Sequence, residues 1–141
     1  MREVLFRGKT PTDYEEGVFG EWVTGFYTRF NETEHRIYSG YAETDCGDYY
    51  PDWFNVLPET VGQYTGLTDK NGKKIFEGDI MPVWENGEKY HYKVIYNGDC
   101  FMLSMLDSEQ GSYPLSVKNG ISEIIGNIHD NPELLKGGVQ E

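Results

Sequence analysis

The chain of 141 residues has no apolar run of the roughly 18 residues that a membrane-spanning helix needs. Its first residues, MREVLFRGKT, lack the apolar core and the small-residue cleavage site of a secretory signal. Cysteine is scarce: Cys46 and Cys100 stand far apart in the sequence and form no metal-like or redox-like pair. These absences predict reduced thiols and a cytoplasmic location.

Basic residues are also few, with 12 Lys and Arg against 24 Asp and Glu, so the formal net charge is −12. The excess of acid is spread over the whole chain. Binding to a nucleic-acid backbone depends mainly on neutralising phosphates with Lys and Arg. The composition therefore disfavours general DNA or RNA binding. A local platform made by Lys70, Lys73, Lys74 and the run KYHYKVIY keeps a nucleic-acid-binding accessory role open as an alternative.

Catalytic and metal-binding patterns are missing as well. The three histidines, His35, His91 and His129, are scattered, whereas a zinc site favours His or Cys in close pairs. His91 alternates with tyrosines, which predicts a strand residue near solvent. No Gly-x-Ser-x-Gly motif or Cys/His pairing is visible. We expect no catalytic residue, no metal and no cofactor, and a metal-dependent hydrolase is the least favoured alternative.

What the chain does contain favours a β protein. Aromatic residues make up 15% of it, and 17 Gly and 6 Pro suggest many tight connections. Period-2 alternation predicts strands at residues 4–8, 21–30, 35–41, 74–81, 89–96, 100–106 and 121–128. Four Asn-Gly pairs fit hairpin turns. The one helical turn predicted lies in HDNPELLKGG, residues 129–138.

The densest stretch, VGQYTGLTDKNGKKIFEGDIM at residues 61–81, is rich in glycine and lysine. It fails the phosphate-loop pattern, because the spacing is wrong and no helix follows. We interpret it as scaffold: Asn71 and Gly72 form a hairpin turn, and Gly78 and Asp79 form a corner in which glycine is free to take a positive φ.

The loop AETDCGDYYPD, residues 42–52, is acidic and runs into a group of large aromatic residues. A weak cation site at Glu43, Asp45, Asp48 and Asp52 is conceivable, but a solvated loop is the simpler interpretation. Aromatic residues dominate interface hot spots. The candidate interface is therefore the set Tyr49, Tyr50, Trp53 and Phe54, with burial in a core as the equal alternative.

The stretch ETVGQYTGLTDKNGKKIFEGDI at residues 59–80 resembles the YopX family of phage and prophage proteins. REVLFRGK near the start, GEWVTGF at 20–26 and IIGNIHDNPELL at 124–135 resemble further landmarks of that family, in order. The resemblance implies a mainly β protein with an antiparallel SH3-like barrel, and a phage or prophage origin in a bacterial host cell. It assigns no functional residues. The chain departs from the family pattern at Pro82, which predicts a bulge or a sheet edge there.

The expected organisation is a single YopX-like domain over residues 1–141. It contains an N-terminal β region at 1–57, an SH3-like barrel at 58–130, and a short helical turn and tail at 131–141. We expect a non-enzymatic protein-interaction or assembly module with a protein partner or self-association. We expect no membrane contact and no small-molecule substrate.

The charge balance gives a first testable prediction. Filter binding to single- and double-stranded oligonucleotides should be weak even at low salt, because a charge of −12 repels phosphate. Submicromolar binding at about 0.15 M salt, where such repulsion is screened beyond about 8 Å, would instead support the nucleic-acid alternative.

Overall fold

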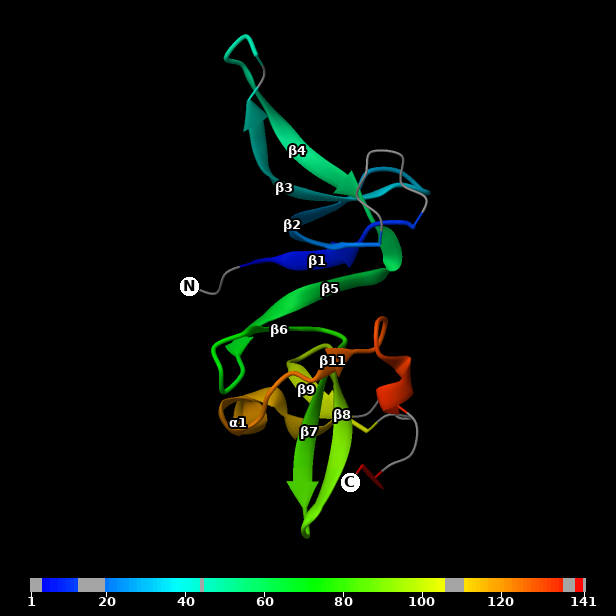
Figure 1. Cartoon of the computed structure of the whole chain (residues 1–141), viewed down its shortest axis with the longest axis vertical. Coiled ribbons are helices and arrows are strands. Elements are labelled where there is room, and N and C mark those ends of the chain that lie inside the picture. The colour runs from blue at the N-terminus through cyan, green and yellow to red at the C-terminus, as the bar shows by residue number, and fades with distance from the viewer. Residues whose placement is uncertain (1–3, 13–19, 44, 106–110, 136–138, 141) are drawn as a thin grey trace. The chain divides into compact units, whose positions relative to one another are not determined.

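The computed structural model describes residues 4–12, 20–43, 45–105, 111–135 and 139–140 (Figure 1). The chain is mainly β, with antiparallel pairing throughout and one short α-helix, as the sequence predicts. It divides into two compact units, Met1–Gln63 and Tyr64–Glu141, and the division falls within a strand. No helix among the described residues is long and apolar enough to cross a membrane.

The N-terminal unit is an antiparallel sheet in the order β4-β3-β2-β1-β5. Its strands are β1 (Phe6–Lys9), β2 (Trp22–Arg29), β3 (His35–Glu43), β4 (Tyr49–Asn55) and the first part of β5 (Leu57–Thr68). Its buried residues include Ile37 and Val56. A Cβ on Gly8 would lie 2.9 Å from the Cβ of Val56, so only glycine lets β1 pass over that side chain.

The C-terminal unit contains the rest of β5 and a second antiparallel sheet in the order β10-β9-β8-β7-β11, with β12 against β8. Its elements are β6 (Lys74–Phe76), β7 (Asp79–Glu85), β8 (Glu88–Tyr96), β9 (Phe101–Ser104), β10 (Gly111–Pro114), α1 (Leu115–Lys118), the 3-10 turn η1 (Asn119–Ile121), β11 (Gly126–Asn127), η2 (Pro132–Leu135) and β12 (Val139–Gln140). The pairings among described strands do not close into a ring.

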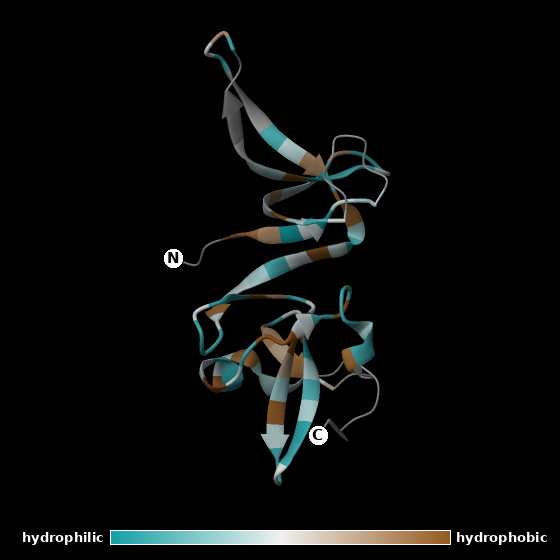
Figure 2. Ribbon diagram, in the orientation of Figure 1, coloured by the Kyte–Doolittle hydropathy of each residue, from teal (hydrophilic) through white to brown (hydrophobic). Residues whose placement is uncertain are grey.

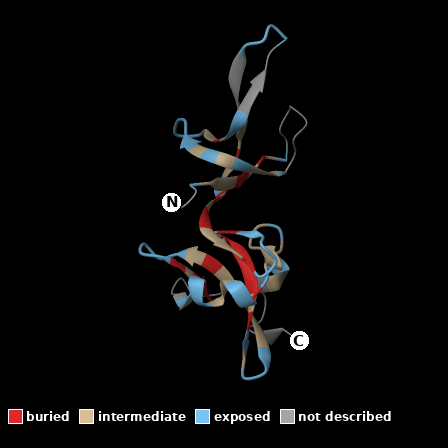
Figure 3. Cartoon of the chain, turned by 90° about the vertical axis from the view of Figure 1, so that its left-hand side faces the viewer, coloured by how far each residue is buried: buried red, intermediate tan, exposed pale blue. Residues whose placement is uncertain are grey.

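The core of the C-terminal unit follows from strand alternation. Met81 and Val83 on β7 point to the same side as Tyr92 and Val94 on β8, and Leu115 of α1 closes the cluster. Met81 and Leu115 are fully buried. In Figure 3 the buried stretches of the C-terminal unit lie mainly along its strands, whereas its turns are largely exposed. Figure 2 shows brown apolar residues among hydrophilic ones along β7, whereas most of β8 is hydrophilic in this colouring.

Several segments differ from the sequence prediction. The predicted loop before residue 55 contains β4, which pairs with β3 along its whole length. The predicted strand at 121–128 is a strand only at Gly126–Asn127. The predicted helical turn is the 3-10 turn η2, while α1 was not predicted. In each case pairing with distant residues or burial of one side chain outweighs local alternation.

The four Asn-Gly pairs also behave differently from one another. Positive φ at both positions, as a type I′ turn requires, occurs at Asn86 and Gly87, between β7 and β8. Asn119 instead takes a helical conformation, and its Nδ2 donates to the carbonyl oxygen of Thr68 at 2.8 Å. A side-chain hydrogen bond to a distant backbone thus redirects a dipeptide that favours hairpins.

His91 is not near solvent, because it is buried at 5% exposure. Its Nδ1 lies 2.9 Å from the carbonyl oxygen of Leu134, to which a protonated Nδ1 donates, so the ring ties β8 to η2. Opposite His91 in the β7–β8 pair stands Pro82, and the register runs through it without a shift. No bulge therefore forms at Pro82.

Two glycines of the N-terminal unit give a matched test of close backbone approach. A Cβ on Gly25 would lie 2.0 Å from the carbonyl oxygen of Tyr38, whereas one on Gly40 would meet nothing within 4 Å. Their φ values are nearly equal, +156° and +153°, so the cost of backbone strain is shared.

Gly25→Ala should therefore destabilise the chain by about 2–3 kcal/mol more than Gly40→Ala, since overpacking costs about that much and backbone relaxes poorly. Urea unfolding followed by fluorescence measures both free energies. Equal losses of unfolding free energy would show that the β3 backbone moves away from the added methyl group at little cost.

Candidate protein-interaction site

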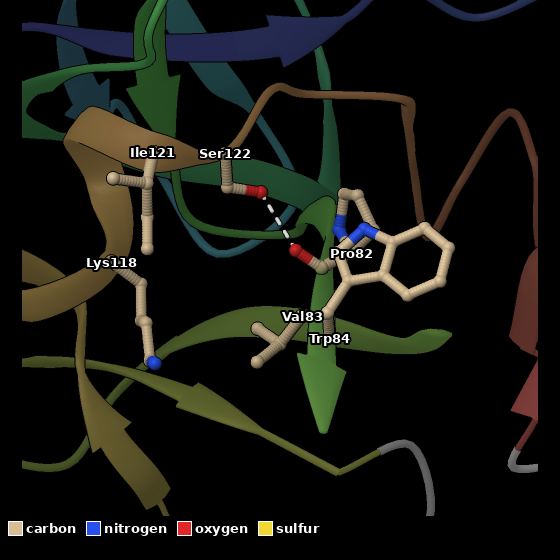
Figure 4. A pocket seen from close by; sticks show the side chains of 6 residues that line it. All are labelled: Pro82, Val83, Trp84, Lys118, Ile121 and Ser122. Carbon is tan, nitrogen blue, oxygen red and sulfur yellow. Dashed lines mark hydrogen bonds between the residues drawn. The ribbon is translucent and has the colours of Figure 1, made fainter. Parts of the chain in front are cut away.

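A small hollow, which we call the β7 groove, lies entirely within the C-terminal unit. Its volume is about 90 Å³, and it is lined by Pro82, Val83, Trp84, Lys118, Ile121 and Ser122. In Figure 4 the first three come from β7, and the others come from the end of α1 and from η1 and the residue after it. The groove thus runs along one edge of β7.

Large apolar side chains stand exposed at this groove. Trp84 is 66% exposed and Ile121 is 74% exposed, and neighbouring Val117 is 61% exposed. The cause is local geometry. Trp84 alternates with core residue Val83 and so faces outward, and η1 turns Ile121 away from the core that Leu115 enters.

The backbone of β7 is only partly paired at the groove. The carbonyl oxygen of Ile80 accepts from Ile125 N at 2.9 Å, and that of Pro82 accepts from Ser122 Oγ at 2.7 Å. The even-numbered residues of β7 therefore point their backbone N–H and C=O groups away from β8. Pro82 loses no ladder bond to β8, because its nitrogen faces the edge.

The charges around the groove are cationic. Lys118 holds its Nζ 4.8 Å from the centre of the Tyr113 ring, and Lys89 stands opposite Trp84 in the β7–β8 pair. The six lining residues include no carboxylate. The nearby acid Glu88 accepts from Tyr90 OH at 2.9 Å, and Glu85 accepts from Tyr92 OH.

The cluster of Glu85, Tyr92 and Tyr113 is a structural brace rather than an acid–base pair. Burial first, and then the hydrogen bond to Glu85, raise the pKa of Tyr92 well above its ordinary value. The same two causes, in the same order, raise the pKa of Tyr113. Both phenols stay protonated at neutral pH and donate to the carboxylate.

The wall of the groove is held in place by Asp69, at the hairpin that joins β5 to β6. This carboxylate is buried at 5% exposure. Its Oδ1 accepts from the backbone N–H groups of Asn71 and Lys73, both at 2.9 Å, and its Oδ2 accepts from Ile124 N at 3.0 Å. One side chain thus closes the hairpin and fastens it to the segment after Ser122.

Neighbouring contacts reinforce this link. Lys70 N donates to the carbonyl oxygen of Ser122 at 2.9 Å, and Asn71 Nδ2 donates to Glu123 Oε2 at 3.2 Å. Desolvation raises the pKa of the Asp69 carboxyl, but the hydrogen bonds from Ile124, Lys73 and Asn71 together outweigh it, so the pKa is lowered.

The residues predicted as structural turns lie in this scaffold. Asn71 and Gly72 form the exposed hairpin tip, where Gly72 has φ +84°. Gly78 has φ +90° at the corner before β7; its N–H donates to Val94 O and its carbonyl oxygen accepts from Ile128 N, both at 2.9 Å. Buried Asp79 accepts from Phe76 N at 2.8 Å.

The lysines considered for nucleic-acid contact lie on two different parts of the C-terminal unit. Lys70, Lys73 and Lys74 are exposed at the hairpin, which is fastened to residues 122–124. Lys89 and Lys93 lie on β8, on either side of His91, where η2 is attached.

The predicted aromatic interface lies on β4, the outermost strand of the N-terminal sheet. Trp53 is only partly exposed, and its ring centre lies 3.9 Å from the Arg36 guanidinium. Phe54 stands opposite buried Ile37. The structure describes only the backbone of Tyr49 and Tyr50, so their side chains lie outside the described residues.

The Arg36 guanidinium also lies 3.5 Å from the Phe30 ring centre and pairs with Glu34 at 3.0 Å. Part of the Trp53 ring is therefore covered by an internal cation–π contact with Arg36. Of the predicted acidic loop, Asp45 and Asp48 are exposed and Asp52 lies in β4; the side chain of Glu43 lies outside the described residues. The described residues contain no group of three potential metal ligands.

The N-terminal unit has a larger hollow of about 470 Å³, lined by Leu5, Thr24, Gly25, Phe26, Tyr38, Ser39 and Gly40. Phe26 is 68% exposed at its rim. The lining contains no residue that ordinarily changes charge near neutral pH, so general acid–base chemistry has no obvious donor there.

The fold and this arrangement define a mainly β protein of two units with an apolar, cationic groove in the second. The chain belongs to the YopX protein family, whose model matches residues 15–136. It is similar to the solved structure of protein EF1440 from Enterococcus faecalis, with 26% identity and a TM-score of 0.58. That match covers 96% of this chain and 100% of the other. No curated protein matches the chain.

Trp84, Lys118 and Ile121 were not predicted as site residues from the sequence. Trp84 carried a usable signal, because a tryptophan beside an Asn-Gly turn and out of phase with Met81 and Val83 must face away from the core. Ile121 carried none, since it opens the run ISEIIGNI, which predicted a strand.

Asp69→Asn should destabilise the chain by about 2–3 kcal/mol at pH 7, because an amide offers one acceptor oxygen where the carboxylate offers two, and charge-assisted bonds are the stronger kind. The folded-state pKa is lowered, so the carboxylate's contribution is complete above the unfolded value of about 3.9 and is lost as pH falls through the folded value.

The difference in unfolding free energy between wild type and Asp69→Asn should therefore become smaller as the pH falls. Urea unfolding between pH 3 and pH 7 measures it, with exposed Asp99→Asn as the matched control. A gap that stays constant with pH would show that the carboxylate's charge is irrelevant.

Proposed function

We propose that this YopX-family protein is a non-enzymatic protein-interaction module that receives a partner at the β7 groove. The observation that carries the proposal is the joint exposure of Trp84 and Ile121 at one hollow. Tryptophan is the residue most enriched in interface hot spots, and grouped exposed apolar side chains mark binding surfaces.

The surroundings of the groove favour binding over catalysis. Its lining contains a lysine but no histidine, carboxylate or thiol, so the residue types that most often transfer protons are absent from it. Its walls are β7 and a segment fastened through Asp69, which gives a rigid surface. A rigid apolar surface loses little entropy when a partner docks.

We interpret the C-terminal unit as an SH3-like barrel that is open in strand pairing. The consecutive antiparallel strands β7, β8 and β9 around one core, with a short helical turn, support this. Membership of the YopX family supports a phage or prophage origin. Two free, exposed cysteines, Cys46 and Cys100, fit the reducing cytoplasm of a bacterial host.

Self-association through Tyr49, Tyr50, Trp53 and Phe54 is the second candidate. The position of β4 at the end of its sheet favours it, since an edge strand offers backbone groups to another chain. Pro51 within β4 weakens it, because proline at a sheet edge interrupts such pairing.

Replacing Trp84 by Ser should abolish partner contact at the groove while leaving the fold intact, because an exposed side chain changes the free energy of unfolding by only about 0.5 kcal/mol. The measurement is photo-crosslinking from a benzophenone amino acid at position 121, in the host cell, with and without Trp84→Ser. Adducts should form with the wild-type groove and disappear in the variant.

The matched control is Phe26→Ser, which removes an equally exposed aromatic ring at the other hollow and should leave the adducts unchanged. Adducts that survive Trp84→Ser, or vanish with Phe26→Ser alone, would contradict the proposed site. Light scattering of the purified protein with either substitution, or with Trp53→Ser, distinguishes a groove partner from self-association through β4.

A further inference from the structure

We propose that the β7 groove recognises a short extended peptide segment in which an aliphatic side chain stands beside an Asp or Glu. This inference rests on the proposed function and adds the chemistry of the partner. Three properties of the groove carry it: its size, its charge and the short open edge of β7.

The size of the groove selects an aliphatic side chain. Its volume of about 90 Å³ lies between Trp84 and Ile121, with Val83 and Pro82 at its base. A cavity of about 150 Å³ admits a benzene ring, so the smaller hollow suits a residue such as Val, Leu or Ile. The flat faces of Trp84 and Pro82 then cover the methyl groups of that residue.

The charge of the groove selects an acidic neighbour. The whole chain has twice as many acidic as basic residues, yet the lining has one lysine and no carboxylate. Lys118 is steadied over the Tyr113 ring, and Lys89 stands beside Trp84 across the strand pair. Three acids adjoin the lining residues in sequence or strand pairing, and each already accepts a hydrogen bond: Glu85 and Glu88 from tyrosines, and Glu123 from Asn71.

Electrostatic complementarity of this kind determines which partner binds more than how tightly it binds. A basic segment would be repelled by the Lys118 ammonium in the groove lining and by Lys89, which stands opposite Trp84. An acidic segment would be attracted at this site, although the net charge of the chain is −12.

The edge of β7 selects an extended segment with few backbone hydrogen bonds. Ile80 and Pro82 already use their outward carbonyl oxygens, and Pro82 has no N–H. The outward-facing backbone of Trp84 can exchange one pair of bonds with an incoming strand. Side chains, rather than added β-sheet, must then supply most of the recognition.

A single-stranded nucleic acid shares the anionic and aromatic requirements but fits less well. A base is larger than the hollow, and the net charge of −12 opposes a polyphosphate over its whole length. Peptide display on the immobilised full-length chain tests the difference. Random heptapeptides are selected against wild type, Trp84→Ser, Lys118→Glu and the charge-matched control Lys73→Glu.

Wild type and Lys73→Glu should enrich peptides with Val, Leu or Ile next to Asp or Glu, and Trp84→Ser should enrich none of them. Lys118→Glu should reverse the preference toward Lys and Arg. A synthetic peptide of the enriched sequence should bind wild type about tenfold more tightly than Lys118→Glu by fluorescence anisotropy, and more weakly as salt rises.

Enrichment of basic peptides by wild type would overturn the inference, as would selection that ignores Trp84. Displacement of the peptide by submicromolar oligothymidylate would assign the groove to nucleic acid instead. A wild-type dimer that Trp84→Ser dissociates would assign it to a second copy. If no peptide is enriched while Trp84-dependent adducts form at position 121, the inference fails and the proposed function stands.

Discussion

The C-terminal unit depends on one carboxylate, that of Asp69. Three backbone N–H groups, from Asn71, Lys73 and Ile124, point at its two oxygens, and two of them belong to the hairpin that it closes. Without this acceptor the three partly buried donors would each lose their partner, which is costly. The segment from Ser122 onward is attached to the hairpin mainly by this side chain and its neighbours. The position of the groove wall therefore depends on Asp69.

That attachment explains why the groove has exposed apolar residues at all. η1 ends at Ile121, and Ser122 is drawn toward β7 by its bond to Pro82 O and toward the hairpin by Lys70 N. Ile121 is left facing outward between these two anchors. An exposed isoleucine and tryptophan cost solubility, and a chain with a net charge of −12 offsets that cost by repulsion between copies.

Much of the fold follows from local pattern. The alternation in β7 and β8, the Asn86-Gly87 turn between them and the glycine corner at Gly78 are determined by side-chain period and by φ. The assignment of Asn71 and Gly72 to a scaffold hairpin rests on the same chemistry. By contrast, β4 and α1 were missed, because pairing with β3 and burial of Leu115 involve residues far away in the chain.

The sequence by itself determined the mainly β class, the YopX membership and the net charge of −12, because these depend on composition, short-range period and residue order. Only the tertiary structure decided where the groove lies. Trp84, Lys118 and Ile121 come from three different elements, and their neighbourhood exists only after β7 has met the segment that Asp69 holds. Proximity between distant residues is a product of packing, and no local pattern encodes it.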